Sequence, residues 1–224
     1  MADVLSDLRT RARYALEEAA ASYWSDAELN SQIVQSYRKL WKKIVAIRKD
    51  WFAATTGTLT LTAAASSKYS LDATCFHVRG IRTTTSGREN VTWQRKTHTD
   101  QQFIEALRAD IAITNPSVMW YDILGNNTLF VAPLVRSSIA IAYEYIATPT
   151  DPTTDASTFG VLDPFTEYIL LDAICRALAK GPIGALDFWR GERQEEWATV
   201  MSTLGMPRSD QSADYVEGMF DNEI

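Results

Sequence analysis

The 224-residue sequence has few of the side chains that bind metals or form disulfides. It contains two cysteines, Cys75 and Cys175, and two histidines, His77 and His98. Free cysteine is usually buried, and disulfides are rare in reducing compartments, so we expect two reduced, packed thiols. Neither histidine has a cysteine or carboxylate at metal-ligand spacing around it. We therefore predict no metal site and no cofactor.

Long apolar runs are also missing. The longest strongly apolar stretch, Leu129 to Val135, is interrupted by Pro133 and is much shorter than the roughly 20 residues of a membrane helix. We therefore expect no membrane contact. Near the beginning of the chain, Asp3, Asp7 and Arg9 lie where a secretory signal would have its apolar core. We expect a protein that is not exported by that route.

Catalytic signatures are equally scarce. The sequence has no glycine-rich phosphate loop and no nucleophile elbow. Ser36 to Lys39 matches Ser-x-x-Lys, but the partner motifs that give this signature its meaning are absent. We therefore predict that the protein is not an enzyme.

The net charge of −6 is concentrated at the C-terminal end. From Met206 onward one base, Arg208, stands against five acids, which gives this segment a net charge of −4. The segment is too polar to form a core by itself, so we predict an extended acidic tail over 206–224. Four spaced apolar residues could anchor this tail on a partner, although a frayed end is the alternative. These residues are Tyr215, Val216, Met219 and Phe220.

Two helices are predicted near the N-terminus. Apolar residues recur at helical spacing from Asp3 to about Ala21. Ser25-Asp26-Ala27-Glu28 has the form of a capping box, in which Ser25 caps the helix and Glu28 reaches back to it. The apolar residues of this second helix cover about a third of its circumference as far as Trp51.

Six basic residues accompany the second helix: Arg38, Lys39, Lys42, Lys43, Arg48 and Lys49. All except Arg48 lie opposite the apolar stripe on a helical wheel. We expect this basic face to meet water or an acidic neighbouring chain. A DNA-binding module is the alternative, because phosphate contacts need Lys and Arg on one exposed face.

The middle of the chain, residues 56–147, has strand patterns. Gly57 to Thr62 alternates with period two. Cys75 to Arg82 and Asn90 to Arg95 flank a glycine-containing turn, which predicts a hairpin. A short helix should follow from about Asp100 to Ala109.

Three further strands are expected: Pro116 to Leu124, Thr128 to Ala132, and Ser137 to Ala147. Gly125-Asn126-Asn127 supplies the turn between the first two. We predict that the three form an antiparallel meander. The segment that follows, Thr148 to Ser157, lacks periodicity and should be an exposed connector.

Two more helices complete the prediction. Asp163-Pro164 begins a helix that Gly181-Pro182 ends. Its apolar residues surround it completely, so it must be covered on every side, either by its own chain or partly by a neighbouring copy. The last helix runs from Ala185 to about Leu204.

The predicted fold class is α+β: helices from both ends of the chain form a bundle, with a β-rich antiparallel insertion and an extended C-terminal tail. The predicted parts are N-terminal helices over 1–55, the insertion over 56–147, the linker and C-terminal helices over 148–205, and the tail.

The order of several segments resembles the head-to-tail adaptor (connector) proteins of tailed phages, especially short-tailed phages. These segments are Trp24–Asn30, Gly57–Leu61, Tyr121–Pro133, Ile141–Tyr145 and the apolar helix after Asp163-Pro164. The likeness extends from about Leu5 to Leu204. It departs at Tyr69–Thr74, which lacks the proline of a Tyr-x-Leu-Pro-x-Asp step.

The resemblance implies a structural virion protein at the head–tail interface, assembled in the host cytoplasm. Its subunits would form a ring, expected to be dodecameric, between the portal protein and tail or nozzle proteins, with genomic DNA passing through. A head-completion or tail-accessory protein is the nearest alternative. Portal contacts would fall to the four apolar residues of the tail, and contacts between subunits to a set on the helices: Arg38, Lys42, Lys49, Tyr168 and Leu171.

Overall fold

The chain folds into two compact units in a computed structural model that describes residues 3–18, 23–62, 67–87, 90–108, 117–125, 127–135, 137–179 and 186–205. The first unit combines Met1–Phe52 with Pro149–Ile224, and the second is Ala53–Thr148. The fold is therefore α+β, with helices and sheets largely in separate units. None of the helices in these described ranges is both long enough and apolar enough to cross a bilayer.

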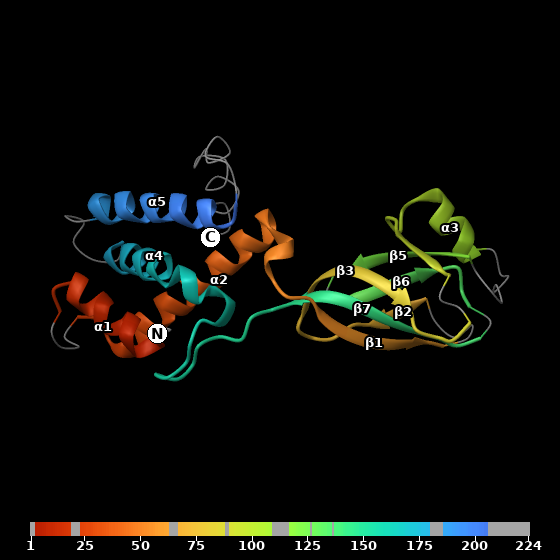
Figure 1. The fold of residues 1–224 in the computed structure, drawn as a ribbon, viewed down its shortest axis with the longest axis horizontal. Helices are drawn as coiled ribbons and strands as arrows, with labels where there is room; N and C mark the ends of the chain where they lie inside the picture. Colours follow the sequence, from red (N-terminus) through yellow and green to blue (C-terminus); the bar gives the residue numbers. More distant parts are fainter. Residues whose placement is uncertain are drawn as a thin grey trace. The chain divides into compact units, whose positions relative to one another are not determined.

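The helical unit (Figure 1) contains α1 (Leu5–Ala15), α2 (Asp26–Ile47), the 3₁₀ turns η1 (Lys49–Trp51) and η2 (Gly160–Phe165), α4 (Thr166–Leu178) and α5 (Leu186–Thr203). Helix α4 contacts α1, α2 and α5. The apolar faces of these helices supply the largest buried side chains of the unit, among them Leu8, Ile33, Leu40, Ile44 and Tyr168.

The predicted capping box of α2 is confirmed. The Ser25 hydroxyl accepts a hydrogen bond from the Glu28 backbone N–H at 3.2 Å, and the Glu28 carboxylate accepts one from the Ser25 N–H at 3.0 Å. Helix α1 is shorter than predicted, because Glu17, which follows the C-cap residue Leu16, adopts a positive φ of 56° and turns the chain. Helix α2 ends at Ile47, four residues before the end of its predicted apolar stripe.

The first turn of the predicted apolar helix is also different from the expectation. Pro164 lies inside η2, and the α-helix begins only at Thr166. Asp163 does not cap α4; its carboxylate instead accepts a hydrogen bond from the backbone N–H of Phe159, the residue before η2, at 2.8 Å.

The β unit contains two sheets. One has the strand order β1 (Thr55–Leu61), β7 (Ile139–Ala147), β3 (Cys75–Thr83), and the other has β2 (Lys68–Ser70), β6 (Thr128–Ala132), β5 (Val118–Leu124), β4 (Thr92–Arg95). Residues from both sheets share one apolar core, which includes Leu61, Val78, Met119, Leu129 and Ile141. Helix α3 (Gln101–Arg108) places Phe103 on Phe130 of β6, with ring centroids 5.1 Å apart.

Two predicted strand pairings are wrong. The expected hairpin does not form: β3 pairs with β7, and β4 pairs with β5 in parallel. A parallel pair requires a crossover connection, and the segment containing α3 supplies it. The expected meander is limited to the antiparallel hairpin of β5 and β6, because β7 belongs to the other sheet.

The cysteine prediction is confirmed. Cys75 and Cys175 are both free thiols and both buried. Burial raises the pKa of the Cys75 thiol to about 11 and raises the pKa of Cys175 as well.

Candidate interaction surfaces of the helical unit

The basic run of α2 divides into side chains that point inward and side chains that point outward. Lys43 is only 4% exposed, with its Nζ atom 4.9 Å from the ring centroid of Trp197 and 3.4 Å from the hydroxyl of Tyr168. Lys39 lies with its Nζ atom 4.0 Å from the carboxylate of Asp172. The expectation that these two lysines face water is therefore wrong, because α4 and α5 provide a carboxylate and aromatic faces for them.

Asp172 of α4 is fully buried, and its carboxylate accepts hydrogen bonds from the Ser36 hydroxyl at 2.9 Å, Arg176 Nε at 2.8 Å and Arg193 Nη1 at 2.9 Å. We call Asp172 and these partners, together with Lys39, the Asp172 cluster. Burial by itself would raise the pKa of Asp172, but Lys39, Arg176 and Ser36 hold it below its ordinary value. The charged carboxylate therefore joins α2, α4 and α5.

The sequence contained a signal for this cluster that periodicity does not use. Asp172 stands in the middle of the segment Tyr168–Leu178, in which the one other charged residue is Arg176. A carboxylate buried among apolar groups needs cationic or hydrogen-bonding partners. Arg176, four positions later, is a local partner at helical spacing. Ser36 lies 136 positions earlier and Arg193 lies 21 positions later, so no local pattern connects these two to Asp172.

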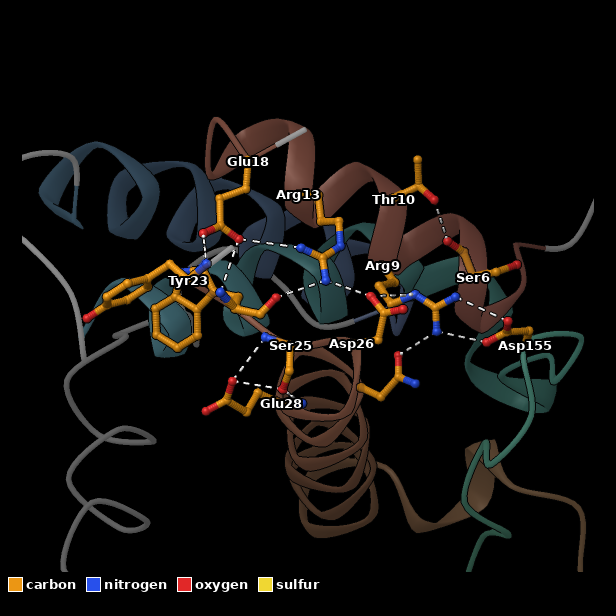
Figure 2. A network of polar contacts seen from close by, with 12 residues as sticks. Ser6, Arg9, Thr10, Arg13, Glu18, Tyr23, Ser25, Asp26, Glu28 and Asp155 are labelled. Atoms are coloured by element: carbon orange, nitrogen blue, oxygen red, sulfur yellow. Dashed lines mark hydrogen bonds and ion pairs between the residues drawn. The ribbon is translucent and has the colours of Figure 1, made fainter. Parts of the chain in front are cut away.

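A second polar network fastens α1 to the start of α2 (Figure 2). Arg13 donates to Asp26 at 2.6 Å and to the Trp24 carbonyl at 2.9 Å, and it lies 3.4 Å from Glu18. The Glu18 carboxylate also accepts the backbone N–H of Tyr23 at 2.8 Å. The turn after α1 is thus bonded to the residues that precede α2.

The same network reaches the connector that returns from the β unit. Arg9 forms a two-bonded pair with Asp155, at 2.8 and 3.1 Å, which lowers the pKa of Asp155. The Ser157 carbonyl accepts the Leu5 N–H at 3.0 Å. The predicted exposed connector therefore has no regular helix or strand over 148–157, but it is bound to the first turn of α1.

The outward group of α2 consists of exposed residues three or four positions apart: Ser31, Gln35, Arg38, Lys42 and Ala46. We call this set the α2 outer stripe. Within it Arg38 forms a two-bonded pair with Asp151 of the connector, in which Nε is 2.7 Å from Oδ1. Lys49 is exposed just beyond the end of α2. Lys42 is exposed and has no ion-pair partner within the part of the chain that the structure describes.

The outer face of α5 has the opposite charge. Its exposed residues at helical spacing are Phe188, Gly191, Glu192, Glu195, Thr199 and Ser202, and we call them the α5 outer stripe. Phe188 is 62% exposed, and its ring lies in a T-shaped arrangement with that of Trp189, with centroids 5.2 Å apart. The carboxylates of Glu192 and Glu195 have no ion pair with a described residue.

Helix α4 has little area left for a neighbouring chain. Tyr168 and Leu171, which the sequence analysis placed at a contact between subunits, are 1% and 6% exposed. The Tyr168 ring packs on Trp197 of α5, with centroids 5.4 Å apart. The sequence left open whether the apolar sides of this helix are covered by its own chain or partly by a neighbouring copy. In the structure they are covered by its own chain.

Large apolar side chains are exposed mainly on the helical unit. The described residues include five such side chains: Tyr14, Tyr23, Phe76, Val161 and Phe188. All except Phe76 belong to the helical unit. Tyr14 is 88% exposed, and the Tyr23 ring points away from the polar network beside it (Figure 2).

The β unit contains a pair of one histidine and one aspartate, His98 and Asp122, that the sequence analysis missed. The carboxylate of Asp122 lies 2.8 Å from His98 Nδ1 and accepts the His98 backbone N–H at 2.9 Å. Burial by itself would raise the pKa of Asp122, but the hydrogen bonds from His98 lower it, and the pKa is lowered overall. The residues are 24 positions apart, so spacing did not reveal them. No group of three potential metal ligands occurs among the residues that the structure describes.

The four apolar residues predicted to anchor the tail, Tyr215, Val216, Met219 and Phe220, lie outside the described residues. No protein-family model matches the chain, and no curated protein matches it.

Proposed function

We propose that this chain is a structural head-to-tail adaptor of a tailed phage, whose copies form a ring between the portal protein and the tail. In this proposal the helical unit is a bundle built from both ends of the chain, and the β unit, which includes the parallel pair of β4 and β5, is its insertion. Genomic DNA passes through the ring and is not bound stably by it. The virion is the expected location.

The observation that carries the proposal is the exposure of apolar side chains on the helical unit. Tyr14, Tyr23, Val161 and Phe188 present more than half of their surface to solvent. Contiguous exposed apolar area marks surfaces that contact other proteins, and the proposal takes these four side chains as parts of such surfaces. An adaptor needs such surfaces for its neighbouring copies and for the portal.

The resemblance to adaptor proteins supports the proposal at the level of elements. Trp24–Asn30 contains the capping box of α2, and Gly57–Leu61 lies in β1. The segment Tyr121–Pro133 spans the hairpin of β5 and β6, and Ile141–Tyr145 lies in β7. Each of these four segments therefore coincides with an element or turn of the fold.

DNA binding through α2 has less support than the sequence suggested. Lys43 is buried, and Lys39 lies beside Asp172. Arg48 forms a two-bonded pair with Asp50, at 2.9 and 2.8 Å. Stable binding would need several uncompensated cations on one face, and these three are committed within the chain.

The test is assembly with the portal protein of the same phage. The purified chain would be analysed by native mass spectrometry and negative-stain electron microscopy, alone and after mixing with portal rings. We expect a ring with a fixed number of copies on each portal. A chain that remains monomeric alone and also with the portal would refute the proposal.

A truncation tests the predicted tail separately. Deletion of Arg208–Ile224 should leave the helical far-UV circular dichroism signal and its melting temperature unchanged, while co-sedimentation with portal rings decreases. The matched variant replaces Tyr215 and Phe220 with serine in the full-length chain, which keeps the acidic residues. Unchanged co-sedimentation of both variants would contradict a role for the tail apolar residues in portal binding.

A further inference from the structure

We propose that the α2 outer stripe of one copy contacts the α5 outer stripe of a second copy of this chain. This inference rests on the proposed ring and names the surfaces that join its subunits. It also assigns a partner to the exposed basic residues of α2, Arg38 and Lys42, in contrast to Lys39 and Lys43, which point inward.

The α2 outer stripe is a basic surface without large apolar side chains. Arg38 and Lys42 are one helical turn apart on it, and Lys49 follows just beyond the helix end. The bond to Asp151 compensates part of the charge of Arg38. Lys42 is therefore the cation at which an approaching carboxylate gains most.

The α5 outer stripe has the complementary chemistry. Glu192 and Glu195 are three positions apart, so their carboxylates share one face of the helix. Phe188 lies one turn before Glu192 on the same face and is largely exposed. An aromatic ring beside a pair of carboxylates gives a neighbouring chain both apolar area and charge specificity.

The two stripes cannot meet within one copy. Both are exposed, whereas the opposite sides of α2 and α5 pack on α4 and on the Asp172 cluster (Figure 1). A contact between two different surfaces of identical chains is heterologous, and heterologous contacts close into rings or extend as filaments. Contact between the stripes is therefore the type of contact that a ring requires.

Charge reversal provides a specific test. Lys42→Glu alone places like charges across every contact, and so does Glu195→Lys alone. We expect each variant to raise the concentration at half-assembly at least about tenfold at low salt, since like charges across an interface are strongly unfavourable. Sedimentation velocity and native mass spectrometry of the full-length chain, with and without portal rings, would measure this.

Mixing the two variants distinguishes the proposed contact from a general loss of assembly. In an alternating ring the reversed α2 of one variant meets the reversed α5 of the other, and the remaining contacts are the natural ones. The equimolar mixture should therefore assemble within about threefold of the wild-type concentration. The double variant, with both reversals in one chain, should do the same.

Arg82→Glu is the matched control, because Arg82 is exposed on β3 of the other unit and its reversal changes the net charge as Lys42→Glu does. Circular dichroism melting of each variant verifies folding. Single variants that assemble like wild type, or a mixture that fails to assemble, would overturn the inferred contact. The ring proposal survives in both cases if the wild-type chain still assembles, and a wild-type chain that never assembles overturns both.

Discussion

Replacing Asp172 with asparagine should strongly destabilise the helical unit. The substitution keeps the size of the side chain and one oxygen acceptor but removes the negative charge. Arg176, Arg193 and Lys39 would then face one another at the junction of α2, α4 and α5 without a carboxylate. The change therefore leaves uncompensated positive charge where the wild type has a satisfied cluster.

The expected magnitude follows from the burial of each group. Removing one partner of a buried ion pair costs about 3–5 kcal/mol. The Asp172 side chain is 1% exposed, but those of Arg193, Lys39 and Arg176 are 16%, 23% and 31% exposed, so water compensates part of their charge. We therefore expect a loss of about 2–4 kcal/mol in the free energy of unfolding.

Urea unfolding followed by the helical far-UV circular dichroism signal measures this loss. The matched control is Asp187→Asn, which removes the charge of a carboxylate that is 94% exposed and lies 3.4 Å from Arg190. An exposed pair of this kind contributes under about 1 kcal/mol. Equal effects of Asp172→Asn and Asp187→Asn would refute the structural role of the buried cluster.

The pH dependence of this difference has a definite sign. Because the pKa of Asp172 is lowered in the folded chain, its contribution is fully present above the ordinary value of 3.8 and is lost as the pH falls through the lower folded value. The difference between wild type and Asp172→Asn should therefore be constant from about pH 5 to 8. It should decrease only in more acidic solution.

Two further predictions concern the β unit and the thiols. A Cβ atom at Gly57 would overlap the buried ring of Tyr143, so Gly57→Ala should lower the free energy of unfolding by about 1–3 kcal/mol. A Cβ atom at Gly80 meets nothing within 4 Å, so Gly80→Ala should cost less. Thermal melting compares the two variants, and equal losses of stability would contradict the predicted overlap. Because Cys75 and Cys175 are buried with raised pKa values, both should react with a thiol-specific disulfide reagent only after unfolding. Rapid reaction of the folded chain at neutral pH would contradict their burial.

Local patterns in the sequence were sufficient for most elements. The capping box at Ser25 and Glu28 located the beginning of α2, because its bonds involve only neighbouring residues. The turn at Gly125–Asn127 identified the hairpin of β5 and β6, whose strand Thr128–Ala132 has the predicted bounds. The α+β class followed from the same periodicities.

Strand pairing was beyond such patterns. Alternation identifies a strand and its two faces, but it does not say which distant strand completes its hydrogen bonds. The partner of β3 is β7 rather than β4, and β4 pairs in parallel with β5 through the segment containing α3. The short strand β2 lacked a clear periodic signal and was not predicted.

The sequence by itself determined most of the helices and strands, which of their faces are apolar and where the charges lie along the chain, because these depend on residues within a few positions of one another. Only the tertiary structure decided which charges remain exposed. Lys39 and Lys42 are near neighbours on α2, yet Lys39 turns toward Asp172 and Lys42 toward water. A buried carboxylate on another helix is a partner for the nearest cations, and its position is set by packing over the whole helical unit rather than by local sequence.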